Sequence, residues 1–239
     1  MVLLAACSTI TGDFSKVVAI LYSGPARPVL EEGDTLTLTA VALGANGDTL
    51  PDVPVIWRRI ALDTATVTFT VDSLTGLLTG VQMGTGRVQG DAEGLRTDTL
   101  RVTILGVPDS IAVADADTIT VDSTETESAA LTTAVYDVSP QGVATPLSGQ
   151  TVQYSLVQPA PDSPEAAGVA LGASGQPVGD DPFVVLTTTI SSGKAFVTAR
   201  RVDSVVAPDT VIVEAVAITS KGVVVPSPPA RFLVLFVNN

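Results

Sequence analysis

Apolar and polar residues alternate along much of the chain, in short runs separated by glycine and proline. In the clearest run, residues 35–41, Leu36, Leu38 and Ala40 share one face and threonines share the other. Successive side chains of a β-strand point to opposite faces, so a period of two predicts a strand with one buried face. The pattern therefore predicts an all-β protein.

Alternating runs or short apolar runs predict strands in many other places: residues 17–21, 53–57, 99–104, 110–113, 118–121, 130–137, 146–156, 195–197, 210–215 and 232–237. The 232–237 run is apolar on both faces, and we expect it to be covered because a bare apolar edge invites aggregation. Asn46-Gly47 predicts a hairpin turn. Trp57 stands in the 53–57 run, where we expect a buried core residue and not a ligand platform.

A family resemblance covers about residues 17–105. It rests on residues that occur in a fixed order, namely Trp57, Ala-Thr-Val at 65–67, Asp72, Thr-Gly-Leu-Leu-Thr-Gly-Val at 75–81 and Gly-Thr-Gly at 84–86. This stretch resembles the bacterial immunoglobulin-like domain of group 2 (BIG2). The resemblance implies a β-sandwich on an extracytoplasmic protein, used as a spacer or adhesion module, with no family-wide catalytic residues.

The chain is expected to hold two immunoglobulin-like β-sandwiches in tandem. Residues 1–16 form an N-terminal anchor and tether, 17–106 the BIG2-like sandwich and 107–239 the second sandwich, in which 130–137 and 146–156 resemble strands of an invasin-type domain. The boundary is placed at Gly106-Val107-Pro108-Asp109 because its proline restricts the backbone. A length of 239 residues is enough for two cores.

Composition excludes several functions. The net charge is −13, from 25 acidic and 12 basic residues, and an acidic surface repels nucleic-acid phosphates. The chain has no histidine, which removes imidazole metal ligands and the usual general base near neutral pH. We therefore expect no nucleic-acid partner, no cofactor and no enzymatic activity.

A lipid-anchor pattern stands at the start of the chain. Leu4-Ala5-Ala6-Cys7 resembles a bacterial lipobox, in which the cysteine is acylated. Two acyl chains would anchor the protein stably, since each buried CH₂ contributes about 0.8 kcal/mol. Six residues before Cys7 are fewer than a signal peptide uses, so we expect the true start to lie upstream. The alternative is a short apolar tail with a chance cysteine.

Two segments are candidate partner contacts. Residues 158–182 predict a long insertion between strands, rich in proline, glycine, alanine and aspartate, with prolines at Pro159, Pro161, Pro164, Pro177 and Pro182. Loops of that length are either functional or mobile. The second candidate is the N-terminus itself, with Met1, Val2, Leu3 and Leu4.

No stretch supports a catalytic or metal site. Ser191-Ser192-Gly193-Lys194 lacks the earlier glycine and the following Ser or Thr of a phosphate loop, so we expect a turn there. Aspartates that could ligate Ca²⁺ do not match the spacing of a calcium loop: Asp115, Asp117, Asp122, Asp180 and Asp181. Solvated carboxylates at turns are the favoured interpretation.

The sequence thus favours a non-enzymatic subunit of the cell envelope, periplasmic or on the outer surface. We expect it to be anchored by lipid on Cys7 and to dock onto an integral-membrane protein complex. The chain also resembles the extra immunoglobulin-like subunits on the periplasmic face of bacterial membrane complexes such as a photosynthetic reaction centre. The alternative is a surface adhesion or glycan-binding lipoprotein, although an aromatic content of 4% offers few sugar platforms.

Overall fold

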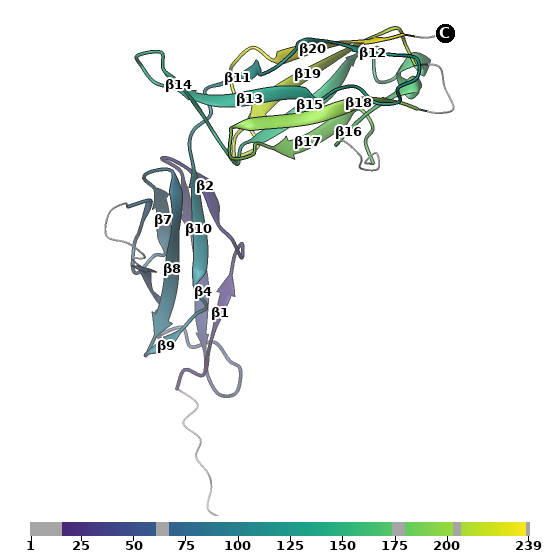
Figure 1. Cartoon of the computed structure of the whole chain (residues 1–239). Helices are drawn as coiled ribbons and strands as arrows, with labels where there is room; N and C mark the ends of the chain where they lie inside the picture. The colour runs from purple at the N-terminus through teal and green to yellow at the C-terminus, as the bar shows by residue number, and fades with distance from the viewer. Residues whose placement is uncertain (1–15, 61–66, 174–179, 203–206, 238–239) are drawn as a thin grey trace, which may run out of the picture. The chain divides into compact units, whose positions relative to one another are not determined.

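The computed structural model describes residues 16–60, 67–173, 180–202 and 207–237 (Figure 1). The chain divides into two compact units, Met1–Ile104 and Leu105–Asn239, beside the boundary expected at residue 106. Each unit is an all-β sandwich with a hydrophobic core of its own. Met1, Val2, Leu3, Leu4, Cys7 and Pro177 lie outside the described residues.

The first unit packs a five-stranded sheet against two smaller sheets. The five-stranded sheet has the order β2 (Val29–Glu31), β10 (Leu100–Leu105), β8 (Gly84–Ala92) and β5 (Ile56–Ile60), with β9 (Leu95–Arg96) also paired to β8. The smaller sheets are β1 (Ala19–Ser23) with β4 (Thr39–Leu43), and β3 (Thr35–Thr37), β7 (Leu77–Gly80) and β6 (Phe69–Val71).

Trp57 stands in the core of this unit, as the alternation of Val53, Val55 and Trp57 predicts. Its side chain is 3% exposed, and Phe69 and Leu78 are fully buried in the same cluster. The ring of Tyr22 meets the indole edge to face, with 6.1 Å between centroids. Aromatic pairs prefer this geometry because the positive edge of one ring faces the negative face of the other.

The prediction of one strand over residues 35–41 is wrong. The run breaks at Leu38, and its two halves pair with different strands. β3 pairs with β7, whereas β4 pairs with β1. Leu36, Leu38 and Ala40 still face inward as the alternation predicts. The alternation describes which face is buried and contains no information about which neighbour each edge meets.

The second unit packs two five-stranded sheets. One has the order β11 (Ser110–Val113), β13 (Leu131–Val138), β18 (Lys194–Arg201) and β16 (Val169–Gly172), with β14 (Ala144–Pro146) also paired to β13. The other has the order β12 (Thr118–Val121), β20 (Ala230–Phe236), β19 (Thr210–Ile218), β15 (Thr151–Gln158) and β17 (Val184–Thr188). Two facing sheets of this kind make an immunoglobulin-like sandwich.

The apolar run at 232–237 is a covered strand, which confirms the prediction. β20 lies inside its sheet, parallel to β12 on one side and antiparallel to β19 on the other. Its residues Phe232, Val234 and Phe236 are buried in the core, while Leu233 and Leu235 are half-buried.

The prediction of a long insertion at 158–182 is wrong for the middle of that segment. A short 3-10 helix, η1 (Pro164–Gly168), leads into β16, which pairs with β18. Val169 is 1% exposed and Leu171 is fully buried in the core. Of the prolines, Pro159 is buried, Pro161 is exposed, Pro164 opens η1 and Pro182 is half-buried. The segment therefore contributes a strand of the sandwich.

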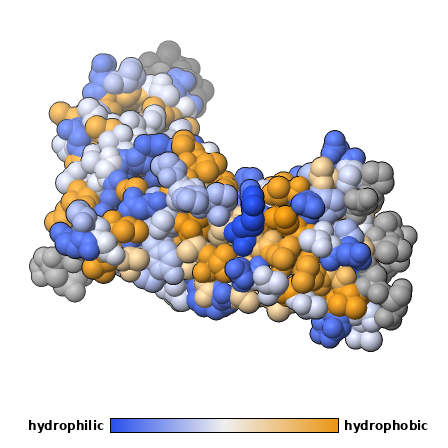
Figure 2. Space-filling view, turned by 90° about the horizontal axis from the view of Figure 1, so that it is seen from above, coloured by the Kyte–Doolittle hydropathy of each residue, from blue (hydrophilic) through white to orange (hydrophobic). Residues whose placement is uncertain are grey.

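The described surface mixes hydrophobic and hydrophilic residues. On the face drawn in Figure 2, hydrophobic residues form several patches between hydrophilic ones. Within the described ranges, no helix has the length and apolar character needed to cross a membrane.

Candidate functional site: a groove beside Trp57

One edge of β4 lacks a neighbouring strand for part of its length. At the N-terminal end, the Leu38 N–H donates to the Gly76 carbonyl at 2.9 Å, which continues the pairing of β3 with β7. At the other end, the Ala42 carbonyl accepts from the Leu50 N–H at 2.9 Å, where the chain returns from the hairpin. β7 begins only after Gly76, so a gap opens between these two bonds.

Ala40 lies in this gap. Main-chain groups of a strand alternate between its two edges, so the N–H and C=O of Leu38, Ala40 and Ala42 point to the same side. β1 pairs with β4 along the opposite edge, with Leu21 beside Val41 and Ser23 beside Thr39. Among the described residues, the Ala40 main chain has no partner across the gap.

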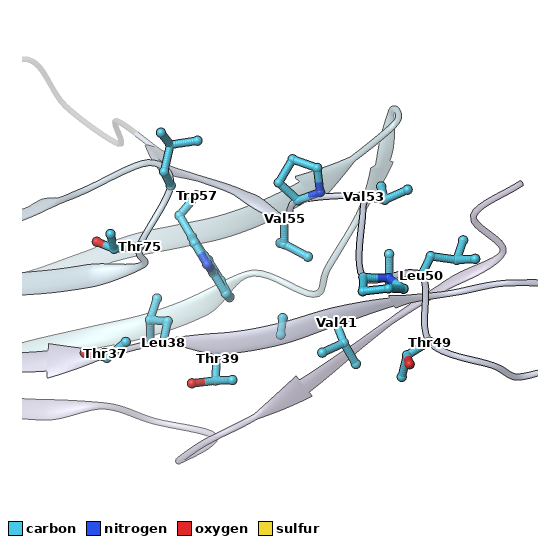
Figure 3. Close-up of a pocket in the computed structure, with 15 residues that line it drawn as sticks. Thr37, Leu38, Thr39, Val41, Thr49, Leu50, Val53, Val55, Trp57 and Thr75 are labelled. Carbon is cyan, nitrogen blue, oxygen red and sulfur yellow. The ribbon is translucent and has the colours of Figure 1, made fainter. Parts of the chain in front are cut away.

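The gap opens into a groove of about 400 Å³ (Figure 3). Fifteen residues line it: Thr37, Leu38, Thr39, Ala40, Val41, Ala42, Thr49, Leu50, Pro51, Val53, Pro54, Val55, Trp57, Leu74 and Thr75. None of them is charged, in a chain whose net charge is −13. The volume is within the range of ligand pockets, about 300–1,000 Å³.

Trp57 stands in one wall of the groove. In Figure 3 its indole lies opposite Leu38 and Thr39, and Val55 and Val53 continue the same wall. No hydrogen bond joins the indole Nε1–H to a described residue, and this atom is not among the fully buried polar atoms that lack a partner, so it borders open space. Because an indole N–H usually finds a partner when it is buried, this donor is available to a bound molecule.

A tight turn closes the end of the groove beside Thr75. The Asp72 Oδ1 accepts hydrogen bonds from the Leu74 N–H at 3.1 Å, the Thr75 N–H at 2.7 Å and the Thr75 Oγ1 at 2.8 Å. These bonds favour the charged carboxylate, and they lower the pKa of Asp72, with the Thr75 N–H contributing most. The hairpin turn predicted at Asn46-Gly47 flanks the opposite end, and Gly47 has φ +84°.

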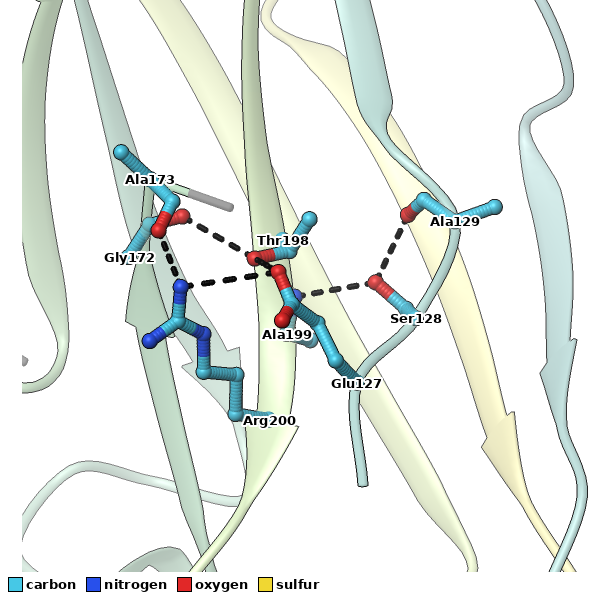
Figure 4. Close-up of polar contacts among 8 residues, drawn as sticks. All are labelled: Glu127, Ser128, Ala129, Gly172, Ala173, Thr198, Ala199 and Arg200. Atoms are coloured by element: carbon cyan, nitrogen blue, oxygen red, sulfur yellow. Dashed lines mark hydrogen bonds and ion pairs between the residues drawn. The ribbon is translucent and has the colours of Figure 1, made fainter. Parts of the chain in front are cut away.

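The second unit carries a polar cluster on β18 (Figure 4). Thr198 Oγ1 lies 2.6 Å from Glu127 Oε1 and 3.2 Å from the Gly172 carbonyl oxygen. Arg200 Nη2 lies 3.5 Å from the same Glu127 oxygen and also donates to the Ala173 carbonyl. The cluster thus links β18 to the end of β16 and to the segment before β13. Its role is structural.

Ser128 extends this cluster on the other side. Its Oγ accepts from the Ala199 N–H at 3.0 Å and donates to the Ala129 carbonyl at 2.7 Å. The Thr198 hydroxyl lies against the Glu127 carboxylate, but Thr198 is 2% exposed and Arg200 already pairs with that carboxylate, so a substrate cannot reach the hydroxyl. We therefore assign the cluster no chemistry.

Two residues considered for chemistry in the sequence, Lys194 and Asp115, meet in the structure as an ion pair. Residues 191–193 form a turn before β18, as predicted, with Gly193 at φ +74°. Lys194 Nζ pairs with Asp115 Oδ1 at 3.1 Å, and this hydrogen bond lowers the pKa of Asp115. Across the described ranges, acidic side chains do not gather in groups of three that could hold a metal ion.

Comparison with known proteins finds no match to a protein-family model or to a curated protein. Among solved structures, the chain is similar to the Yersinia pseudotuberculosis adhesin InvE, with 14% identity and a TM-score of 0.37 over 91% of this chain and 58% of that chain. It is also similar to the Clostridium thermocellum CbhA fibronectin(III)-like modules, with 13% identity and a TM-score of 0.36 over 92% of this chain and 95% of that chain.

The D00-D0 domain of Intimin gives 18% identity and a TM-score of 0.30 over 90% of this chain and 99% of that chain. For the adhesin InvE, the chain covers 58% of the other chain, which is little more than half of its length. TM-scores this low carry no argument about function. The immunoglobulin-like fold rests on the sheets described above, and the BIG2 resemblance stays a prediction.

Sequence reasoning located Trp57 and missed the groove beside it. The groove depends on where β7 ends and where the hairpin returns, and both are main-chain features. The available signal is indirect: the turn residues Asp72 and Gly76 mark the end of one neighbour, and Asn46-Gly47 marks the return of the other. To infer the groove from these two turns, one must also know which strands pair with β3 and β4, and periodicity does not supply that.

Proposed function

We propose that the chain is a non-enzymatic structural subunit outside the cytoplasm, which docks onto a larger integral-membrane complex. The observation that carries the proposal is the tandem of two self-contained sandwiches, each with its own core, joined across a short segment that contains Pro108. Such modules serve well as spacers because each buries a hydrophobic core of its own.

Membrane attachment is the second part of the proposal, and it rests on the sequence. Acylation of Cys7 would hold the N-terminus at the membrane surface. The BIG2 resemblance likewise implies a location outside the cytoplasm. A photosynthetic reaction centre is one candidate complex, although no motif in the chain selects it.

A pull-down from native membranes tests both parts. The full chain with a C-terminal tag is solubilised in mild detergent, and the retained proteins are identified by mass spectrometry. A constant set of integral-membrane proteins supports the docking role, and recovery of the protein alone contradicts it. Metabolic labelling with a fatty acid should mark the wild-type chain and not the Cys7→Ser variant, and label in both would contradict the anchor.

A second candidate function is adhesion or glycan binding at the cell surface. The groove beside Trp57 favours it, because threonine hydroxyls and an indole N–H could donate to a sugar. Against it, Trp57 is 3% exposed, which leaves little aromatic face for a sugar ring. Binding of the purified chain to a glycan array, lost on Trp57→Phe substitution, would support this candidate.

A further inference from the structure

We propose that the groove beside Trp57 binds an extended, uncharged polypeptide segment of a partner protein, which adds to the open edge of β4 at Ala40. The inference deepens the docking role proposed above by naming the surface and the chemistry of the partner. Addition of a strand to an exposed sheet edge is a general mode of peptide recognition, in which main-chain bonds supply affinity and pockets for alternate side chains supply specificity.

The main chain of β4 provides the first reason. The Leu38 N–H and the Ala42 carbonyl are already bonded to Gly76 and Leu50. The Ala40 N–H and C=O between them form a donor and an acceptor on one residue, with the spacing of a strand edge. Another extended main chain supplies the matching acceptor and donor together.

The lack of charge in the lining provides the second reason. A charged segment would lose its hydration on entering a groove that offers no counter-charge. The free energy of that desolvation is unfavourable. An uncharged segment loses little on entry. The surrounding protein is strongly acidic, so it also repels acidic segments at longer range.

The walls of the groove provide the third reason. Leu50, Val53 and Val55 line it with apolar side chains, Val41 borders it on β4, and the Trp57 indole adds one donor. Alternate side chains of an added strand would rest on these walls. The opening runs from Leu38 to Ala42, which at about 3.3 Å per residue accommodates a segment of about five residues.

Other occupants fit less well. A lipid acyl chain would cover the Ala40 N–H and the indole N–H without bonding them, and leaving buried polar groups without a hydrogen bond is costly. A sugar ring would stack on an aromatic face, and Trp57 is 3% exposed. Both are outcomes that the test below distinguishes.

Selected peptides give the direct test. A phage library of random dodecapeptides is selected on the purified full chain, and the enriched sequences are synthesised and titrated into ¹⁵N-labelled protein. The chain has one tryptophan, so the indole N–H gives a single, unambiguous resonance. We expect uncharged peptides with alternating apolar residues, which shift the Ala40 amide and the indole N–H together.

Two variants and a matched control locate the binding. Val41 is 37% exposed and lines the groove, whereas Val81 is 50% exposed and does not. Val41→Asp should weaken peptide binding at least tenfold, and Val81→Asp should leave it unchanged. Ala40→Pro removes the proposed donor and places the proline ring at its position, which strand edges tolerate, and it should weaken binding to a similar extent.

Several results would overturn the proposal. They are selection of no peptide that shifts the Ala40 amide, binding that survives both groove variants, or shifts caused by glycans or by detergent acyl chains and not by peptides. The pull-down of Val41→Asp separates this proposal from the proposed function. If membrane proteins remain bound while peptide binding is lost, the docking role stands and uses another surface.

Discussion

Gly76 packs so closely against Trp57 that a Cβ on it would lie 2.8 Å from the indole Nε1 and 2.4 Å from the Leu38 carbonyl oxygen. The residue also has φ +70°, a conformation that glycine adopts without steric cost. The glycine thus allows the turn to approach both the groove wall and the strand that breaks at Leu38.

Gly76→Ala should therefore destabilise the first unit by about 2 kcal/mol or more, from backbone strain and overpacking together. Gly47→Ala is the matched control. Gly47 has φ +84°, but a Cβ on it would meet no atom within 4 Å, so it should lose only about 1 kcal/mol. Denaturant unfolding followed by the fluorescence of the single tryptophan reports on this unit. Equal losses would contradict the close packing at Trp57.

The second unit holds a buried tyrosine by two hydrogen bonds. The Tyr154 hydroxyl lies 2.7 Å from Thr133 Oγ1 and 2.8 Å from the Ala195 carbonyl oxygen. Tyr154→Phe should destabilise this unit by about 1–3 kcal/mol because it leaves buried polar groups unsatisfied. Tyr136→Phe, at a half-buried position, should change stability by less than about 0.5 kcal/mol. Unfolding is followed by circular dichroism, and similar losses would contradict the prediction.

Burial raises the pKa of Tyr154 to about 12. The folded state therefore favours the neutral phenol, and this stabilisation is fully present below the unfolded pKa of about 10. It is lost as the pH rises from about 10 through the folded pKa of about 12. The unfolding free energy of wild type should fall relative to that of Tyr154→Phe over this window. Tyrosinate absorbance measured in parallel should rise with unfolding, and ionisation of Tyr154 near pH 10 in a folded chain would contradict the prediction.

The turn at the end of the groove should weaken in acid. Hydrogen bonds from Thr75 and Leu74 lower the pKa of Asp72, so the stability they contribute is present above the unfolded pKa of about 4 and is lost as the pH falls through the lower folded value. The stability difference between wild type and Asp72→Asn should be constant above pH about 5 and should shrink below about 4. A difference that stays constant into acid would show that the charge is unimportant there.

Periodicity predicted the faces of the strands well because burial acts on side chains. Trp57 and Val55 are buried as their alternation predicts. The same reasoning failed at Leu38, where the strand continues in its pattern but changes its partner. Pairing is decided by residues distant in sequence, and a local pattern contains no information about them.

The segment 158–182 shows a different failure. Its prolines and glycines indicate a loop. The four residues Val169–Gly172 among them nevertheless form β16. The run is short, and burial on both faces gives it no alternation to detect. Leu171 is nevertheless fully buried in the core, so deletion of the segment would remove part of the sandwich.

The open edge of β4 can be tested without any partner. Thr39 and Val41 lie in register with Ser23 and Leu21 of β1, so their amides should be protected from hydrogen exchange. The Ala40 amide points to the groove and should exchange at least tenfold faster than both neighbours, because no described residue accepts its proton. Exchange measured by NMR on the ¹⁵N-labelled chain checks this order, and the Leu38 amide, bonded to Gly76, serves as the control on the same edge. Protection of Ala40 equal to that of Leu38 would mean that the edge is closed, and the groove would then offer no main chain to an added strand.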